Sequence, residues 1–323
     1  MFVHEDRDFD DLLRIVADEH GLTVGLVEKD YWVTHVLWAL LHQGFDVWFK
    51  GGTSLSKGFG LIERFSEDLD LKVSPGRVLA LPEVSDWTRE GAGITAERRA
   101  YFETLVRLLE VPGGEPSLVE ELADRSWRSA GIRVTYPGRH LSDLGPLRPF
   151  VLLEVGSARV TPYVERDLTS FVHDYLERQG QLAAFDDNRP RAVRCVHPLV
   201  TLIEKLDAPH RRVPRDELDP STFVRHFEDA ARIIAAASSL PPLDSYPDIA
   251  ALTDEMRSEG QIQQRPSADD PAFLPGDDER WTQIRNAYRA IEPMYWGERV
   301  TLEDACATIR DWASTELMSP EHA

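Results

Sequence analysis

One short stretch of this 323-residue chain, FKGGTSLSKGFGLIERFSEDLDL at 49–71, constrains its structure more than any other. Asp68 and Asp70 stand two positions apart in an apolar segment that is typical of a strand at 66–73. A β-strand places such residues on the same face, with Leu69 pointing the other way. Like charges on one face repel each other, so folding alone gives no reason for this pair. The pair therefore predicts a positive partner close to the strand.

A glycine turn precedes the acidic segment. Gly51 and Gly52 separate an expected strand, 45–50, from an expected short helix, 53–59. Glycine lets the backbone approach a ligand closely, and the free N–H groups at the start of a helix favour anions. With the hydroxyl of Ser54 nearby, this turn predicts a site for a triphosphate. It is not a Walker A loop, because the second glycine of that motif is absent.

The chemistry expected of the acidic pair is metal binding. Two Mg²⁺ ions would relieve the repulsion between Asp68 and Asp70, because Mg²⁺ prefers carboxylate oxygens and substrate phosphates. Glu154 is the candidate third ligand, since it is a lone charge in the apolar strand candidate PFVLLEVGS. Each piece also has an ordinary interpretation: Gly-Gly is a common turn, and Asp-X-Asp is frequent on solvated strands. Their closeness in the sequence favours a site.

The hydrophobic pattern divides the chain into a mixed first part and a helical second part. Thr23 is placed to cap a helix that runs to about 42 and ends at Gly44. Residues 74–130 are typical of a mainly helical excursion. Within and after it we expect helices at 96–109 and 118–128 and strands at 132–136 and 150–157. From about 197 we expect helices starting at Pro198 and Pro220, a long loop within 241–280, and helices at 280–293 and 301–317.

We therefore predict an α+β fold in two lobes, 1–190 and 191–323. The net charge of −20 argues against a general attraction to nucleic acid or anionic membranes, although it leaves room for a local basic cleft. The sequence has no apolar run long enough for a membrane span and no secretory signal at its start. Cys195 and Cys306 lie far apart and are expected to be buried thiols of a reducing cytoplasm.

The wording of several segments resembles one family. The stretch at 49–71, VEKDYWVTHVL at 27–37, HPLVTLIEKL at 197–206, FVRHFEDAARI at 223–233 and the tail from 281 resemble AbiEii/AbiGii nucleotidyltransferase toxins, which include the MenT toxins. Within the wider DNA-polymerase-β-type superfamily, the resemblance implies a nucleotidyltransferase lobe with a small mixed sheet and a helical C-terminal lobe. It covers most of the chain except about 74–130 and 241–275.

The resemblance implies an enzyme that transfers a nucleoside monophosphate from an NTP to the 3′ end of tRNA and so blocks translation. It implies a cognate antitoxin partner, no membrane and a cytoplasmic location, and we expect a monomer. The residues it singles out, with those from the turn and strand, fall into three groups. They are the catalytic candidates Asp68, Asp70, Lys205 and Asp229; the nucleotide-binding candidates Gly51, Gly52, Thr53, Ser54, Lys57, Arg64 and Ser66; and the metal ligands Asp68, Asp70 and Glu154.

The candidates outside the glycine turn and the acidic pair can also be interpreted as purely structural residues. Lys205 could pair with a neighbouring carboxylate, and Asp229 could form an i,i+4 ion pair with Arg225 worth about 0.3–0.5 kcal/mol. The adjacent Glu228 makes the assignment of Asp229 ambiguous. Lys29 and Asp30, which match the family's N-terminal KD, interrupt a strongly apolar helix and could form a structural ion pair. Arg64 could touch a phosphate or pair with an acidic neighbour.

Two further hypotheses concern charge. Ser66 is expected on the face of Asp68, so its phosphorylation would place negative charge beside the metals and inactivate the enzyme. RNA binding requires a basic surface, and the sequence offers an arginine cluster whose ordinary interpretation is a solvated surface. The cluster comprises Arg189, Arg191, Arg194, Arg211, Arg212 and Arg215.

Two rival functions remain open at this point. The first keeps the chemistry but transfers the nucleotide to a protein side chain or a small molecule. The second is a non-catalytic module that uses a nucleotide pocket to bind a partner, against which the intact Gly, Ser, Asp and Lys positions argue.

Overall fold

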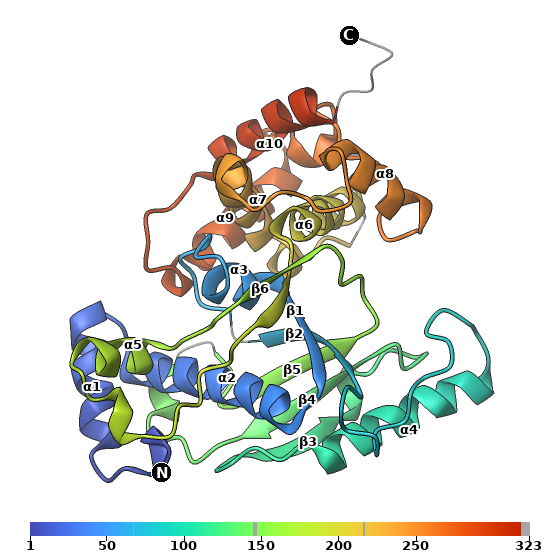
Figure 1. Ribbon diagram of the computed structural model, residues 1–323. Helices are drawn as coiled ribbons and strands as arrows, with labels where there is room; N and C mark the ends of the chain where they lie inside the picture. The colour runs from blue at the N-terminus through green and yellow to red at the C-terminus, as the bar shows by residue number, and fades with distance from the viewer. Residues whose placement is uncertain (67, 145–146, 216, 318–323) are drawn as a thin grey trace. The chain divides into compact units, whose positions relative to one another are not determined.

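The computed structural model describes residues 1–66, 68–144, 147–215 and 217–317 (Figure 1). Residue 67 of the predicted acidic strand and residues 318–323 of the predicted second lobe lie outside this description. The chain forms two compact units. The first comprises Met1–Gly58, Ser66–Val160 and Glu165–Cys195, and the second comprises Phe59–Phe65, Thr161–Val164 and the chain from Val196 onward.

Among the described residues, seven strands form one mixed sheet in the order β3-β4-β5-β2-β1-β7-β6. Strand β2 pairs in antiparallel fashion with β1 and in parallel fashion with β5, which places the acidic strand in the middle of the sheet. The strands are β1 (Asp46–Lys50), β2 (Asp68–Ser74), β3 (Glu115–Val119), β4 (Ser129–Thr135), β5 (Val151–Gly156), β6 (Tyr163–Arg166) and β7 (Val193–Val196).

The alternation in β2 explains its position. Leu69 and Leu71 are almost completely buried, whereas Asp68 and Asp70 are partly exposed on the opposite face. The apolar face contributes to the core, as a period of two residues requires in a half-buried strand. The predicted strand and its division into an acidic face and an apolar face are therefore confirmed.

The helices of the first unit support the sheet. Helix α2 packs against β1 and β5, and α4 packs beside the edge strand β3 (Figure 1). Thr23 caps α2 by accepting a hydrogen bond from the N–H of Leu26 at 3.3 Å, and Gly44 ends it with φ of 95°, as the sequence predicts. The helices are α1 (Phe9–His20), α2 (Val24–Gln43), α3 (Gly51–Lys57), α4 (Ala92–Leu108) and α5 (Phe171–Arg178).

The helix predicted at 118–128 is wrong. Leu118 and Val119 instead end β3, where they pair with Ile132 and Gly131 of β4. Only a short 3-10 turn, Glu120–Leu122, follows. Pairing with a distant strand overrides the local preference, because a β-ladder satisfies the backbone and apolar side chains at once. The segment 74–130 therefore contributes a helix and an edge strand.

The second unit is mainly helical. Its core contains Phe223, Phe227, Phe273 and Trp281, and α7 packs against both α6 and α10. The stretch 241–280, predicted to include a long loop, also contains α8. The helices are α6 (Pro198–Arg212), α7 (Arg225–Ala236), α8 (Ile249–Ser258), α9 (Glu279–Ala290) and α10 (Leu302–Glu316). The α+β class is thus confirmed.

Candidate functional site

The glycine turn and the acidic strand meet in the first unit. Strand β1 ends at Lys50, and α3 begins at Gly51 with φ of 72°. A Cβ atom added to Gly51 would lie 1.7 Å from Oδ2 of Asp70, so the carboxylate packs directly on the bare glycine backbone. Thr53 fixes the same junction, because its hydroxyl donates to the carbonyl oxygens of Ser66 at 2.8 Å and Asp68 at 2.6 Å. The two halves of the motif therefore form one structure.

A third carboxylate joins this junction from β5. Glu154 lies opposite Asp70 in the parallel register of β2 and β5. Burial by surrounding protein, the negative charges of Asp70 and Asp68 and a side-chain hydrogen bond with Asp70 raise the pKa of Glu154 to about 7. The side chain of Glu154 still reaches solvent through a pocket, so this burial is incomplete. The three carboxylates therefore lie close enough for their negative charges to repel one another.

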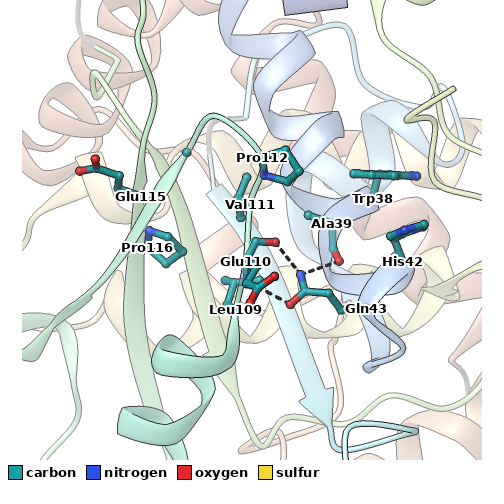
Figure 2. A pocket seen from close by; sticks show the side chains of 11 residues that line it. Trp38, Ala39, His42, Gln43, Leu109, Glu110, Val111, Pro112, Glu115 and Pro116 are labelled. Carbon is teal, nitrogen blue, oxygen red and sulfur yellow. Dashed lines mark hydrogen bonds between the residues drawn. The ribbon is translucent and has the colours of Figure 1, made fainter. Parts of the chain in front are cut away.

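The pocket beside the cluster has a volume of about 290 Å³. Lys50, Asp70 and Glu154 line it together with the backbone of β4 at 129–131. A charged pocket next to crowded carboxylates is the usual setting of a functional site. A second pocket in the same unit, of about 560 Å³, lies between α2 and the loop before β3, where Trp38, His42 and Pro112 line it (Figure 2). This second pocket contains none of the predicted site residues.

Sequence reasoning missed one cation at the cluster. Nη1 of Arg148 donates to Oδ1 of Asp68 at 2.7 Å, and its positive charge partly offsets the upward shift in the pKa of Glu154. The carbonyl oxygen of Arg148 accepts a hydrogen bond at 2.5 Å from Nζ of Lys29, a fully buried residue of α2. Arg148 lies 80 residues beyond Asp68, in an irregular segment. The sequence feature related to this contact is Lys29, a charged residue within the strongly apolar helix α2.

The second unit brings together three other candidates. Asp229 accepts two hydrogen bonds from Arg64, at 2.8 and 2.7 Å, and one from Nζ of Lys205 at 2.7 Å. Asp229 is completely buried, Arg64 is 2% exposed and Lys205 is 6% exposed. Burial alone would raise the pKa of Asp229, but the charges of Arg64 and Lys205 lower it well below its usual range. Burial lowers the pKa of Lys205, which Asp229 only partly opposes.

These contacts replace the pairs considered from the sequence. Asp229 bonds to Arg64 and Lys205, whereas the adjacent Glu228 accepts hydrogen bonds from Arg232 and Arg299. The two neighbouring carboxylates thus have separate partners. Lys205, Asp229 and Arg64 form one buried cluster in the second unit.

The comparison with protein families decides the identity of the chain. Residues 37–308 match the family model described as nucleotidyl transferase AbiEii toxin, type IV TA system. This match spans well over half of the sequence. The chain belongs to the AbiEii family. It is accordingly a nucleotidyltransferase toxin of a type IV toxin–antitoxin system, and its family implies an NTP substrate and an antitoxin partner.

Among solved structures, the chain is similar to MenT4, a nucleotidyltransferase toxin from Mycobacterium tuberculosis H37Rv. The identity is 18% and the TM-score 0.40, over 92% of this chain and 99% of MenT4. No curated protein matches the chain. None of the described helices has the length and apolar character needed to cross a membrane.

The AbiEii chain has carboxylates suited to a metal, but they are not arranged as a complete set of ligands. Within the described ranges, no three His, Cys, Asp or Glu side chains are arranged to hold a metal ion as they stand. Asp68, Asp70 and Glu154 have the oxygen chemistry that Mg²⁺ requires. Their present contacts include the guanidinium of Arg148 on Asp68 and the hydrogen bond between Asp70 and Glu154. The oxygens of these three carboxylates therefore suit a hard cation such as Mg²⁺, which would replace the contact of Asp68 with Arg148 and that of Asp70 with Glu154.

Other candidates from the glycine turn contact protein atoms. The ammonium of Lys57 lies 2.6 Å from Oδ1 of Asp30 and donates to the carbonyl oxygen of Thr169 at 2.9 Å. Asp30 also accepts a hydrogen bond from the backbone N–H of Phe171, so Asp30 of α2 links the end of α3 to the start of α5. The hydroxyl of Ser54 is buried without a standard hydrogen bond, beside the thiol of Cys195. Nucleotide contacts by these residues stay predictions.

The arginines predicted to contact RNA are largely paired with acidic groups. Arg189 pairs with Asp187 and Glu177, and Arg191 pairs with Asp167 and Asp187. Arg194 pairs with Asp46, and Arg211 with Asp207. The guanidinium groups of Arg212 and Arg215 donate to carbonyl oxygens. Neighbouring carboxylates therefore offset the positive charge of four of these six arginines, and RNA contact there stays a prediction.

Proposed function

We propose that this AbiEii toxin transfers a nucleoside monophosphate from an NTP to the 3′ end of tRNA, with Mg²⁺ held by Asp68, Asp70 and Glu154. The observation that carries the proposal is the packing of Asp70 on Gly51, since it places a carboxylate beside a turn suited to phosphates. Such a metal, as two ions, would supply positive charge to the reacting phosphate and the leaving group. A tRNA acceptor implies a reaction in the cytoplasm.

The transfer is a displacement at phosphorus. The 3′ hydroxyl oxygen of the acceptor forms a bond to the α-phosphorus while the bond from that phosphorus to the bridging oxygen breaks. Pyrophosphate leaves, and the hydroxyl proton passes to water. The chain's own part is to bind the triphosphate at the Gly51–Ser54 turn and to keep the acidic strand against that turn through Thr53.

We assign Asp229 a positioning role in place of a catalytic base. A general base must reach the proton that it accepts, and Asp229 is completely buried and bonded to two cations. Its charge instead fixes the ammonium of Lys205 and the guanidinium of Arg64. Lys205 is the member of the cluster that we propose neutralises phosphate charge.

The test is the transfer of label from each α-³²P-labelled NTP to purified tRNA. Wild-type protein should label tRNA with at least one NTP, and Asp70→Ala should lower the rate by about 10³-fold or more, because metal charge stabilisation is worth several kcal/mol. Asp18→Ala, which removes an exposed carboxylate of α1, is the matched control and should retain activity. Undiminished labelling by Asp70→Ala would overturn the proposed site.

The same labelled NTPs separate the other acceptors. Label recovered in protein or in a small molecule, with none in tRNA, would replace the acceptor and keep the chemistry. Absence of both label transfer and pyrophosphate release with every NTP would favour a non-catalytic binding module.

A further inference from the structure

Arg148 holds a carboxylate that the proposed function needs for a metal. Its guanidinium lies 2.7 Å from Oδ1 of Asp68, where the Arg148 side chain is 40% exposed and that of Asp68 is 20% exposed. Its positive charge also acts on Glu154, the third carboxylate of the cluster. Arg148 therefore places its positive charge on Asp68, the carboxylate to which a divalent cation would otherwise bind.

The backbone and the side chain of Arg148 are held differently. The buried ammonium of Lys29 in α2 anchors the carbonyl oxygen of Arg148 at 2.5 Å. The side chain beyond that anchor is 40% exposed, so water can solvate the guanidinium when it moves away from Asp68. Its backbone would meanwhile stay beside the site.

We propose that Arg148 is an exchangeable counter-cation: it neutralises Asp68 before metal binds, and it then transfers to a phosphate of the incoming nucleotide. The inference rests on the proposed function, because it takes Asp68 to be a metal ligand. A divalent cation on Asp68 would repel the guanidinium, whereas a triphosphate would attract it. The planar fork of arginine suits two phosphate oxygens, as it suits a carboxylate.

The proposal predicts opposite effects on two binding constants. Arg148→Gln should bind Mn²⁺ alone about two- to five-fold more tightly than wild type, because the competing ion pair is gone. The same variant should bind an NTP analogue with an α,β-methylene bridge, in saturating Mn²⁺, about tenfold more weakly, because a charge-assisted hydrogen bond to phosphate is lost. A purely structural role would weaken both.

Binding of Mn²⁺ can be followed by electron paramagnetic resonance of the free ion, and binding of the analogue by calorimetry. Arg133→Gln is the matched control, since Arg133 lies in the same unit, on Ser117 and the ring of Phe150, and its loss should leave both constants unchanged. Arg148→Lys, which keeps the charge but loses the fork, should resemble wild type with Mn²⁺ alone and fall between wild type and Arg148→Gln with the analogue.

Asp68→Asn separates a failure of the proposed role of Arg148 from a failure of the proposed metal site. If Asp68→Asn weakens Mn²⁺ binding while Arg148→Gln behaves like wild type in both titrations, the inference about Arg148 is overturned and the proposed metal site stands. If Asp68→Asn binds Mn²⁺ as wild type does, the proposed metal site and the inference fail together. Weaker binding of both probes by Arg148→Gln would also overturn the exchange.

Discussion

The two charged clusters of this toxin use the same residue types with opposite electrostatics. In the first unit, three carboxylates lie close together on neighbouring strands, with Arg148 on Asp68, and the pKa of Glu154 is raised to about 7. In the second unit, Asp229 is completely buried between Arg64 and Lys205, and its pKa is lowered. The first cluster brings like charges together, whereas the single carboxylate of the second lies between two cations. A lone carboxylate between buried cations therefore indicates a structural ion pair, whereas carboxylates crowded together indicate a site for an added cation.

The largest effect expected from this comparison is on stability. Asp229→Ala would leave two buried cations without their partner and should lower the free energy of unfolding by about 3–5 kcal/mol. Asp70→Ala removes a carboxylate from a crowded cluster, so the unfolding midpoint of the ligand-free protein should stay unchanged or rise. Urea unfolding of both variants measures the contrast. A loss below about 1 kcal/mol for Asp229→Ala would contradict the picture of a buried cluster held together by its carboxylate.

A smaller effect is expected at the glycine turn. Gly51→Ala adds a Cβ atom 1.7 Å from Oδ2 of Asp70 at a φ of 72°, so it should both strain the backbone by about 1–2 kcal/mol and displace the carboxylate. Gly21→Ala is the matched control, because Gly21 has φ of 65° but nothing within 4 Å of the added atom. Both variants should melt at a lower temperature, and only Gly51→Ala should lose transfer activity. Equal activity in the two variants would show that Asp70 does not depend on the turn.

The smallest effect expected concerns pH. The pKa of Glu154 is raised in the folded protein from 4.5 to about 7, so its contribution to stability is greatest below pH 4.5 and is lost as the pH rises through 7. The difference in melting temperature between wild type and Glu154→Gln should therefore shift against wild type between pH 5 and 8. Saturating Mg²⁺ should reduce that shift, since a bound cation favours the ionised carboxylate. A difference that does not change with pH would contradict the crowding of Glu154.

The sequence predicts well what depends on local pattern. The cap at Thr23, the turn at Gly51 and the alternation of β2 follow from residue types a few positions apart, and the structure has each of them. The end of β3, at 118–119, is predicted as the start of a helix because its partner in β4 lies beyond the local window. Helices α1 and α5 lie outside the predicted elements, although the buried residues Phe9, Leu13 and Val16 of α1 recur at helical spacing.

The candidate site shows the same limit. The meeting of Asp70 with Gly51 was predictable, because only a short connection separates them. The partners of Lys57 and Asp68 were not, since Asp30 and Arg148 come from distant segments that fold against the turn and the acidic strand. Likewise, the sequence proposed Lys205 and Asp229 separately, and only the packing of α6 against α7 brings them together with Arg64.

The most direct measurement of the central claim is anomalous X-ray scattering from crystals soaked with Mn²⁺ and a non-transferable NTP analogue. The account predicts a manganese peak bonded to oxygens of Asp68 and Asp70, with the triphosphate on the Gly51–Ser54 turn. A nucleotide bound elsewhere, or manganese absent from these two carboxylates while the analogue is bound, would contradict it.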